Sequence, residues 1–167
     1  MATRNAVQSL LNLLIALLVV GSLTTACKKS GGPDSDIDPR DQYVGVYDGS
    51  YTSTTYINNS LPASDPEPGI VQITVTKAQT AKQMYLELLF NNTTKQNLTA
   101  ELTDSTFIVI DKKSEPLAFG GKTYDAQYTA QGQFVRKDNK ITLNTTAETL
   151  QLGVTLTKRG DITGTKK

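Results

Sequence analysis

The stretch that decides the fold is YVGVYDGSY, residues 43–51, in which three tyrosines and two glycines occupy every second position. A period of two puts these residues on one face of a β-strand and the intervening residues on the other face. Tyrosine and valine also favour strands, because their side chains pack well on a pleated surface. The segment therefore predicts a half-buried strand.

The same alternation recurs up to residue 156, in runs rich in valine, isoleucine, leucine, threonine and tyrosine. The most regular run is the last, with leucine or valine at positions 150, 152, 154 and 156. Turn-forming residues separate the runs at 91–94, 103–105 and 137–140, and longer breaks occupy 58–69 and 111–122. The other predicted strands lie at 71–76, 84–90, 98–102, 107–110, 124–130, 141–143 and 150–156.

About eight strands joined mainly by short turns, with no helical stripe, predict an all-β antiparallel meander. Such a sheet removes its exposed edges by closing into a barrel or by folding into a sandwich. We expect a barrel over residues 41–160, with a β-sandwich as the alternative, followed by a polar tail at 161–167. The side chains expected to face its interior include Tyr47, Leu86, Leu88, Leu152 and Val154.

Residues 1–26 have the parts of a signal peptide. Arg4 and the amino terminus supply positive charge, residues 10–20 are apolar except for Asn12, and small residues lead up to Ala26. The apolar run is shorter than the roughly 20 residues that a membrane span needs. A cleaved signal peptide is expected, and an uncleaved anchor helix is the alternative.

The residues at the end of this segment, LTTAC at 23–27, contain the only cysteine of the chain. They resemble the lipobox of bacterial lipoproteins, with Thr24 where leucine is usual, a spacing similar to that of Bacteroidetes-type lipoproteins. The resemblance implies diacylglycerol transfer to the Cys27 thiol, cleavage between Ala26 and Cys27, and acylation of the new amino group. Two or three acyl chains, at about 0.8 kcal/mol per buried methylene, hold a protein stably on a membrane.

Residues 27–40 contain the lipidated cysteine and a tether rich in glycine, proline, serine and aspartate. The thirteen residues from Lys28 to Arg40 can span at most about 45 Å. Lys28 stands where the inner-membrane retention signal of enterobacterial lipoproteins has aspartate. That comparison implies the outer membrane, and it leaves open whether the domain faces the periplasm or the exterior.

A second resemblance covers DPRDQYVGVY, residues 38–47, which is similar to the opening of small Bacteroidetes-type lipoproteins with a lipocalin-like barrel. Lipocalins have Gly-x-Trp in the first strand and a basic residue after the last strand. Here Gly45-Val46-Tyr47 and Lys158-Arg159 stand in for these features. The resemblance implies an arginine stacked on an aromatic ring at the closed end of the barrel. The chain departs from lipocalins in having no tryptophan, no disulfide and no helix before the last strand.

Composition excludes several kinds of chemistry. The chain has no histidine, the commonest general base and metal ligand, and its 17 basic and 16 acidic residues give no electrostatic case for binding nucleic acid. Asp34, Asp36 and Asp38 have the spacing of a calcium loop, but Pro39 and Gly45 stand where that loop needs glycine and glutamate. No catalytic, cofactor-binding or metal-binding residue is therefore predicted.

These observations predict a lipid-anchored, non-catalytic barrel that binds a small apolar or saccharide ligand, or another protein of the cell envelope. Seven tyrosines are available for stacking on such a ligand. The alternatives are an interaction module with a solid core and a glycoside hydrolase that uses an inward-facing pair, Glu87 and Glu101. An interior cavity of about 300 Å³ or more distinguishes a binding barrel from a solid one.

Overall fold

The computed structural model describes residues 38–167, so the predictions for the signal peptide, Cys27 and most of the tether lie outside the described residues. Within 38–167 no helix is long and apolar enough to span a bilayer. Two short 3₁₀ turns and ten strands make up this part of the chain. They are η1 Asp41–Tyr43, β1 Gly45–Ile57, β2 Leu61–Pro62, β3 Glu67–Lys77, β4 Gln83–Phe90, β5 Thr94–Thr103, β6 Thr106–Val109, β7 Ser114–Phe119, β8 Lys122–Val135, η2 Arg136–Asp138, β9 Lys140–Gln151 and β10 Val154–Lys166.

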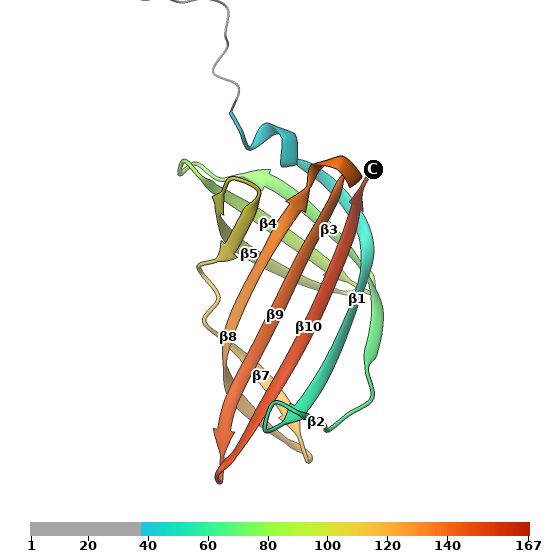
Figure 1. Ribbon diagram of the computed structural model, residues 1–167, viewed down its shortest axis with the longest axis vertical. Helices are drawn as coiled ribbons and strands as arrows, with labels where there is room; N and C mark the ends of the chain where they lie inside the picture. Colours follow the sequence, from blue (N-terminus) through green and yellow to red (C-terminus); the bar gives the residue numbers. More distant parts are fainter. Residues whose placement is uncertain (1–37) are drawn as a thin grey trace, which may run out of the picture. The chain divides into compact units, whose positions relative to one another are not determined.

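Eight of the strands form a closed antiparallel barrel in the order β1-β3-β4-β5-β6-β8-β9-β10. Pairing of β1 with β10, from Tyr47↔Lys166 to Ile57↔Leu156, closes it. Strands β8, β9, β10 and β1 run side by side along one wall, and β3 to β5 cross behind them (Figure 1). The all-β prediction and the closed barrel are confirmed, and the sandwich alternative is wrong.

Strand β7 lies within 111–122, which the sequence predicted to be a break. Strands β6 and β7 occupy successive parts of the same edge of β8: β6 pairs with Gln131–Gln133, and β7 pairs with Lys122–Gln127. The other edge of β7 pairs with no described strand. Pro116 argued against a strand in the sequence, but proline is tolerated on such an edge. The predicted break at 58–69 likewise contains β2 and the start of β3.

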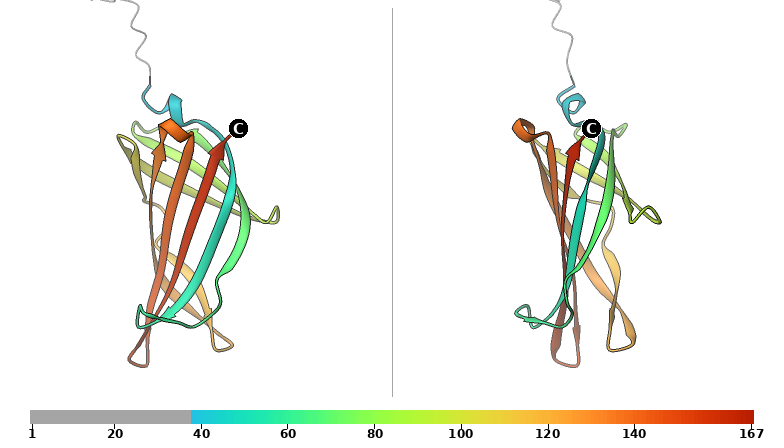
Figure 2. Two further views of the ribbon diagram at one scale, coloured as in Figure 1. Left: turned by 45° about the vertical axis from the view of Figure 1, so that its right-hand side comes forward. Right: turned by 90° about the vertical axis from the view of Figure 1, so that its right-hand side faces the viewer.

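The η1 turn lies at one end of the barrel (Figure 1; two further views in Figure 2). Aromatic residues pack together at that end. The ring of Tyr43 stacks on Phe134 with centroids 4.3 Å apart, and the guanidinium of Arg136 lies 5.6 Å from the Tyr43 centroid. Tyr47 is 2% exposed and donates a hydrogen bond from its hydroxyl to the carbonyl of Tyr43. The lipocalin resemblance implied an arginine stacked on an aromatic ring at this end. That arginine is Arg136 of η2, and it lies over Tyr43 rather than Tyr47.

Lys158 and Arg159 lie in the middle of β10, so the prediction that they follow the last strand is wrong. The predicted polar tail at 161–167 is wrong for the same reason, because β10 continues to Lys166. Only Ile162 in this polar stretch is a buried apolar side chain. A Cβ at Gly164 would lie 3.0 Å from the Cβ of Tyr47, so glycine makes room for that aromatic ring.

The leucines at 150 and 152 do not face the interior. Leu152 and Gly153 form a two-residue hairpin turn with positive φ angles of 49° and 82°. Leu150 is 68% exposed and Leu152 is 104% exposed. The apparent strand at 150–156 is therefore the end of β9, a turn and the start of β10, and Val154 is only partly buried against the core.

The folded unit begins at Asp38, three residues before the predicted boundary. Arg40 fastens this segment to the β3–β4 turn, because its Nη1 donates to the carbonyls of Ala78, Thr80 and Gln83 at 2.9–3.1 Å. The Asp38 carboxylate accepts from Nε and Nη2 of Arg40 at 3.0 and 2.7 Å. These hydrogen bonds hold the pKa of Asp38 well below its ordinary value.

Candidate functional site

A cavity of about 290 Å³ lies inside the barrel. Its lining comes from seven of the eight barrel strands and from β7, so residues far apart in the sequence meet there. Ten of the fourteen lining side chains carry a polar atom. The lining residues are Tyr51, Ser53, Glu67, Leu88, Phe90, Asn91, Thr94, Gln96, Glu115, Tyr128, Thr145, Lys158, Gly160 and Ile162.

The burial of these residues distinguishes a floor from a rim. Leu88, Tyr128 and Ile162 on the floor are at most 5% exposed. Glu67 and Thr94 at the rim are exposed. Strand β7 pairs only with β8, so no hydrogen bonds join it to β5. Both β5 and β7 contribute residues to the lining, and the mouth of the cavity therefore lies between these two strands.

One side of the mouth is aromatic. The rings of Tyr51 and Phe90 meet edge to face with centroids 5.0 Å apart. Asn91 donates from Nδ2 to the Tyr51 hydroxyl at 3.0 Å, and its Oδ1 accepts from the backbone of Ile70 at 3.1 Å. A Cβ at Gly69 would lie 2.5 Å from Cζ of Tyr51, so glycine allows this ring to lie against β3. The contacts hold Tyr51 in one orientation, as a stacking platform requires.

The opposite side carries charge. Lys112 makes an ion pair with Glu115 at 2.5 Å, and its ammonium lies 4.1 Å from the centroid of the Tyr128 ring. Burial, with the charge of Glu115, raises the pKa of Tyr128 to about 12. The side-chain amide of Gln96 lies near the Tyr128 hydroxyl and lowers the pKa of Tyr128, which offsets part of the rise caused by burial. The two groups do not meet the distance and angle of a hydrogen bond. The buried Nε2 of Gln96 has no hydrogen-bond partner among the described residues.

Two further charged groups line the cavity from β3 and β10. Glu67 accepts a hydrogen bond from the hydroxyl of Ser53 at 3.3 Å. Lys158 is half-buried, and no carboxylate among residues 38–167 lies within ion-pair distance of its ammonium. The cavity can therefore offer hydrogen-bond acceptors at Glu67, donors at Lys158 and Gln96, and aromatic faces between them.

The structure does not bring Glu87 and Glu101 together inside the barrel. Both lie on the outer face, where Glu87 pairs with Lys95 at 2.7 Å and Glu101 is exposed. The alternative that required an inward pair is therefore wrong for these two residues, since Leu86 and Leu88 occupy the inward positions beside Glu87. The carboxylates that line the cavity are Glu67 and Glu115, which lie in the two segments that the sequence predicted to be breaks. No pattern in those segments indicated an inward face.

Of the acidic triplet with calcium-loop spacing, only Asp38 lies within the described residues. Its carboxylate binds Arg40. No group of three or more acidic residues within 38–167 is arranged to hold a metal ion.

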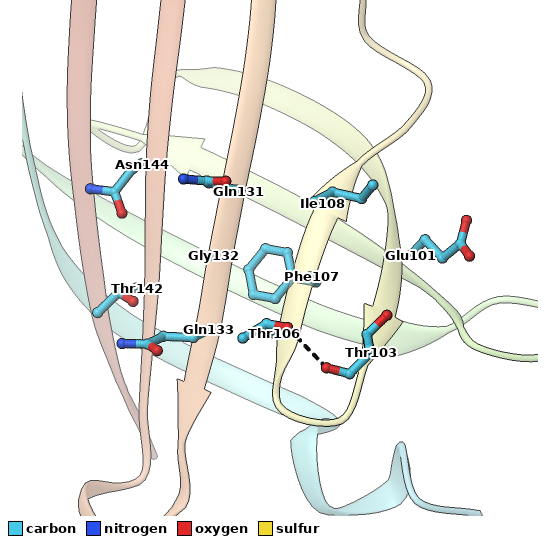
Figure 3. Close-up of a pocket in the computed structure, with 10 residues that line it drawn as sticks. All are labelled: Glu101, Thr103, Thr106, Phe107, Ile108, Gln131, Gly132, Gln133, Thr142 and Asn144. Atoms are coloured by element: carbon cyan, nitrogen blue, oxygen red, sulfur yellow. Dashed lines mark hydrogen bonds between the residues drawn. The ribbon is translucent and has the colours of Figure 1, made fainter.

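A second hollow, of about 530 Å³, lies on the outer face where β6 meets β8 (Figure 3). Gly132 in its lining leaves room for the buried ring of Phe107, because a Cβ there would lie 2.4 Å from Cζ of that ring. Its other residues are mostly exposed and polar, including Gln131, Gln133 and Asn144. The interior cavity is the stronger candidate site, because the barrel wall shields its floor from water and charged side chains line its walls.

Comparison with known proteins identifies no family. No family model and no curated protein sequence matches the chain. One similar solved structure is a crystal structure of a protein of unknown function from the DUF3598 family of Nostoc punctiforme, with 9% identity and a TM-score of 0.38. The match covers 76% of this chain and 48% of that one, so the chain spans about half the length of that protein.

Proposed function

We propose that this protein is a lipid-anchored protein of the bacterial outer membrane whose barrel binds a small saccharide without catalysis. The observation that carries the binding role is the interior cavity of about 290 Å³, close to the lower limit for small-molecule sites. A solid interior would have favoured a purely structural module.

The polar lining favours a saccharide over an apolar ligand. An apolar ligand would cover Gln96 and Lys158 and leave these polar groups without partners, which costs free energy. Sugar hydroxyls can both donate to Glu67 and accept from Gln96, while the rings of Tyr51 and Phe90 can pack against a sugar ring. A cavity of this size suits one or two sugar rings.

A binding role is favoured over glycoside hydrolysis because the two cavity carboxylates are poorly suited to acid catalysis. A glycosidase needs an uncharged carboxylic acid beside the scissile bond. Glu115 instead forms an ion pair with Lys112, and Glu67 lies at the exposed rim.

The anchor rests on the sequence LTTAC at 23–27, and its test is Cys27→Ser. The variant should lose labelling by radioactive palmitate in cells and should no longer fractionate as a processed outer-membrane protein. A Ser30→Ala variant is the matched control and should label normally. Labelling that survives Cys27→Ser would refute the anchor.

The binding role is tested separately, by calorimetric titration of the full chain in detergent with a panel of neutral and acidic monosaccharides and disaccharides. Binding should be lost in Tyr51→Ala, which removes one wall of the mouth, and retained in Tyr85→Ala, whose tyrosine is 48% exposed outside the cavity. The absence of binding by every member of the panel would refute a saccharide site.

Protein binding is the second candidate function, favoured by the exposed leucines at 150 and 152 on the β9–β10 hairpin. Two leucines at the end of a hairpin form an apolar contact surface that a partner could cover. Replacing both with serine should abolish crosslinking of the chain to such a partner in whole cells and leave saccharide titration unchanged. Crosslinking that persists would exclude this hairpin as the contact.

A further inference from the structure

We propose that the cavity selects a sugar that carries a carboxylate, with Lys158 and Gln96 binding that group. This inference rests on the proposed saccharide site and narrows it from saccharides in general to sugar acids.

The first observation is that two of the donors in the cavity wall make no hydrogen bond or ion pair within the described residues. Lys158 is half-buried and has no ion-pair partner among the described residues. The Nε2 atom of Gln96 is buried and makes no hydrogen bond within the described part of the chain. A buried donor without a partner costs free energy that a ligand acceptor recovers.

The second observation is that the other charges of the cavity are satisfied or exposed. Glu115 is neutralised by Lys112. Glu67 accepts from Ser53 and lies at the rim, where water screens its charge. The half-buried charge without a partner is therefore the positive one at Lys158, which calls for an anion.

The register of the strands separates the positive and negative groups. Glu67 pairs with Ser53 across β3 and β1, and Ser53 pairs with Gly160 across β1 and β10. Lys158 lies two residues further along β10, on the same inward face. The Cα atoms of Glu67 and Lys158 thus lie about 10 Å apart or more, given the ordinary spacing of two strands and one diagonal step, and their charged groups form no ion pair with each other.

The different strand positions of the two groups orient the ligand. The carboxylate lies against Lys158, where it gains a charge-assisted hydrogen bond, and hydroxyls at the other end of the sugar donate to Glu67. A neutral sugar makes the hydroxyl contacts alone. A fatty acid would bind Lys158 through its carboxylate but has no hydroxyls to donate to Glu67.

The test compares glucuronate with glucose, which differ only at the carboxylate, by calorimetric titration of the full chain in detergent. Glucuronate should bind about tenfold more tightly, since one charge-assisted hydrogen bond contributes on the order of that factor. Lys158→Met should remove the preference, Lys158→Arg should keep it, and Lys140→Met, at an exposed position outside the cavity, should leave it unchanged. Gln96→Leu should reduce it in part.

The outcomes separate the two proposals. Equal binding of glucose and glucuronate, unaltered by Lys158→Met, would refute selection of a sugar acid and leave the saccharide site standing. Binding of neither sugar, nor of any other member of the panel, would refute both. Circular dichroism of each variant verifies that the barrel is folded.

Discussion

Replacing Gly49 with alanine should open the seam that closes the barrel. Gly49 pairs with Gly164 across β1 and β10. A Cβ at Gly49 would fall on the carbonyl oxygen of Thr163 and lie 2.7 Å from Cα of Gly164. Both are backbone atoms, so the strands themselves must move apart.

The size of the effect follows from two opposing terms. Overpacking of this kind costs about 1–3 kcal/mol, and a clash with backbone lies at the upper end of that range. Alanine also lowers the entropy of the unfolded chain, which offsets about 0.4–1 kcal/mol. The net loss expected for Gly49→Ala is therefore about 2 kcal/mol.

Gly160→Ala provides the matched control on the same pair of strands. Its Cβ would lie 2.5 Å from Oγ1 of Thr145, a hydroxyl that can rotate away, and no other atom comes closer than 3.9 Å. Rotation sacrifices the weak bond from Thr145 to the Gly160 carbonyl, about 1 kcal/mol, which the entropy gain largely offsets. We expect a change of less than about 1 kcal/mol.

The assay is equilibrium unfolding in urea, followed by tyrosine fluorescence because the chain has no tryptophan. Gly49→Ala should lower the midpoint clearly, and Gly160→Ala should leave it almost unchanged. Equal losses in the two variants would contradict the view that close backbone approach at the seam requires glycine at 49.

Leu152→Asn should raise the free energy of unfolding by about 0.5–1 kcal/mol, and with it the urea midpoint, because asparagine tolerates the left-handed conformation that leucine adopts there. An unchanged or lower midpoint would argue against strain at this turn. Asp38→Asn should destabilise the protein at neutral pH, and the difference should vanish in acid. Since folding lowers the pKa of Asp38, its contribution is present above the unfolded value of about 4 and is lost as pH falls below it, which pH-dependent unfolding will measure. Burial raises the pKa values of Tyr47 and Tyr128 to about 12, so stability should fall from about pH 10, where unfolded tyrosines ionise, towards pH 12. Tyr128→Phe should reduce that alkaline loss, and tyrosinate absorbance that rises fully near pH 10 in the folded protein would contradict it.

The closed barrel was predictable because its evidence is local. Alternation and turn residues identify most of the strands individually. A meander of antiparallel strands has two exposed edges, and closing into a barrel is one of the few ways to protect them. The predicted last strand ended too early, at residue 156, because the last third of β10 holds a single buried apolar side chain, Ile162. The hairpin at Leu152 was hidden because leucine occupies a position where asparagine or glycine would have signalled a turn.

The candidate site was less predictable, because it depends on register rather than on local pattern. The outward orientation of Glu87 follows from its neighbours Leu86 and Leu88, so the sequence alone could have excluded an inward position for Glu87. Glu115 faces the cavity because β7 continues β6 along β8, a pairing that no local signal specifies. Lys158 faces the cavity because β10 continues to Lys166, past residue 156, where the alternation of apolar and polar residues ends.

The fastening of Asp38 and Arg40 to the β3–β4 turn has a mechanical consequence. A pull on the chain from its N-terminal side first meets the three carbonyls that Arg40 binds. Beyond them it loads β1 along its own length, between β10 and β3, which pair with it at eleven and nine positions. Hydrogen bonds perpendicular to a strand share such a load in parallel rather than breaking one after another. The barrel is therefore built to resist force applied at its N-terminal end.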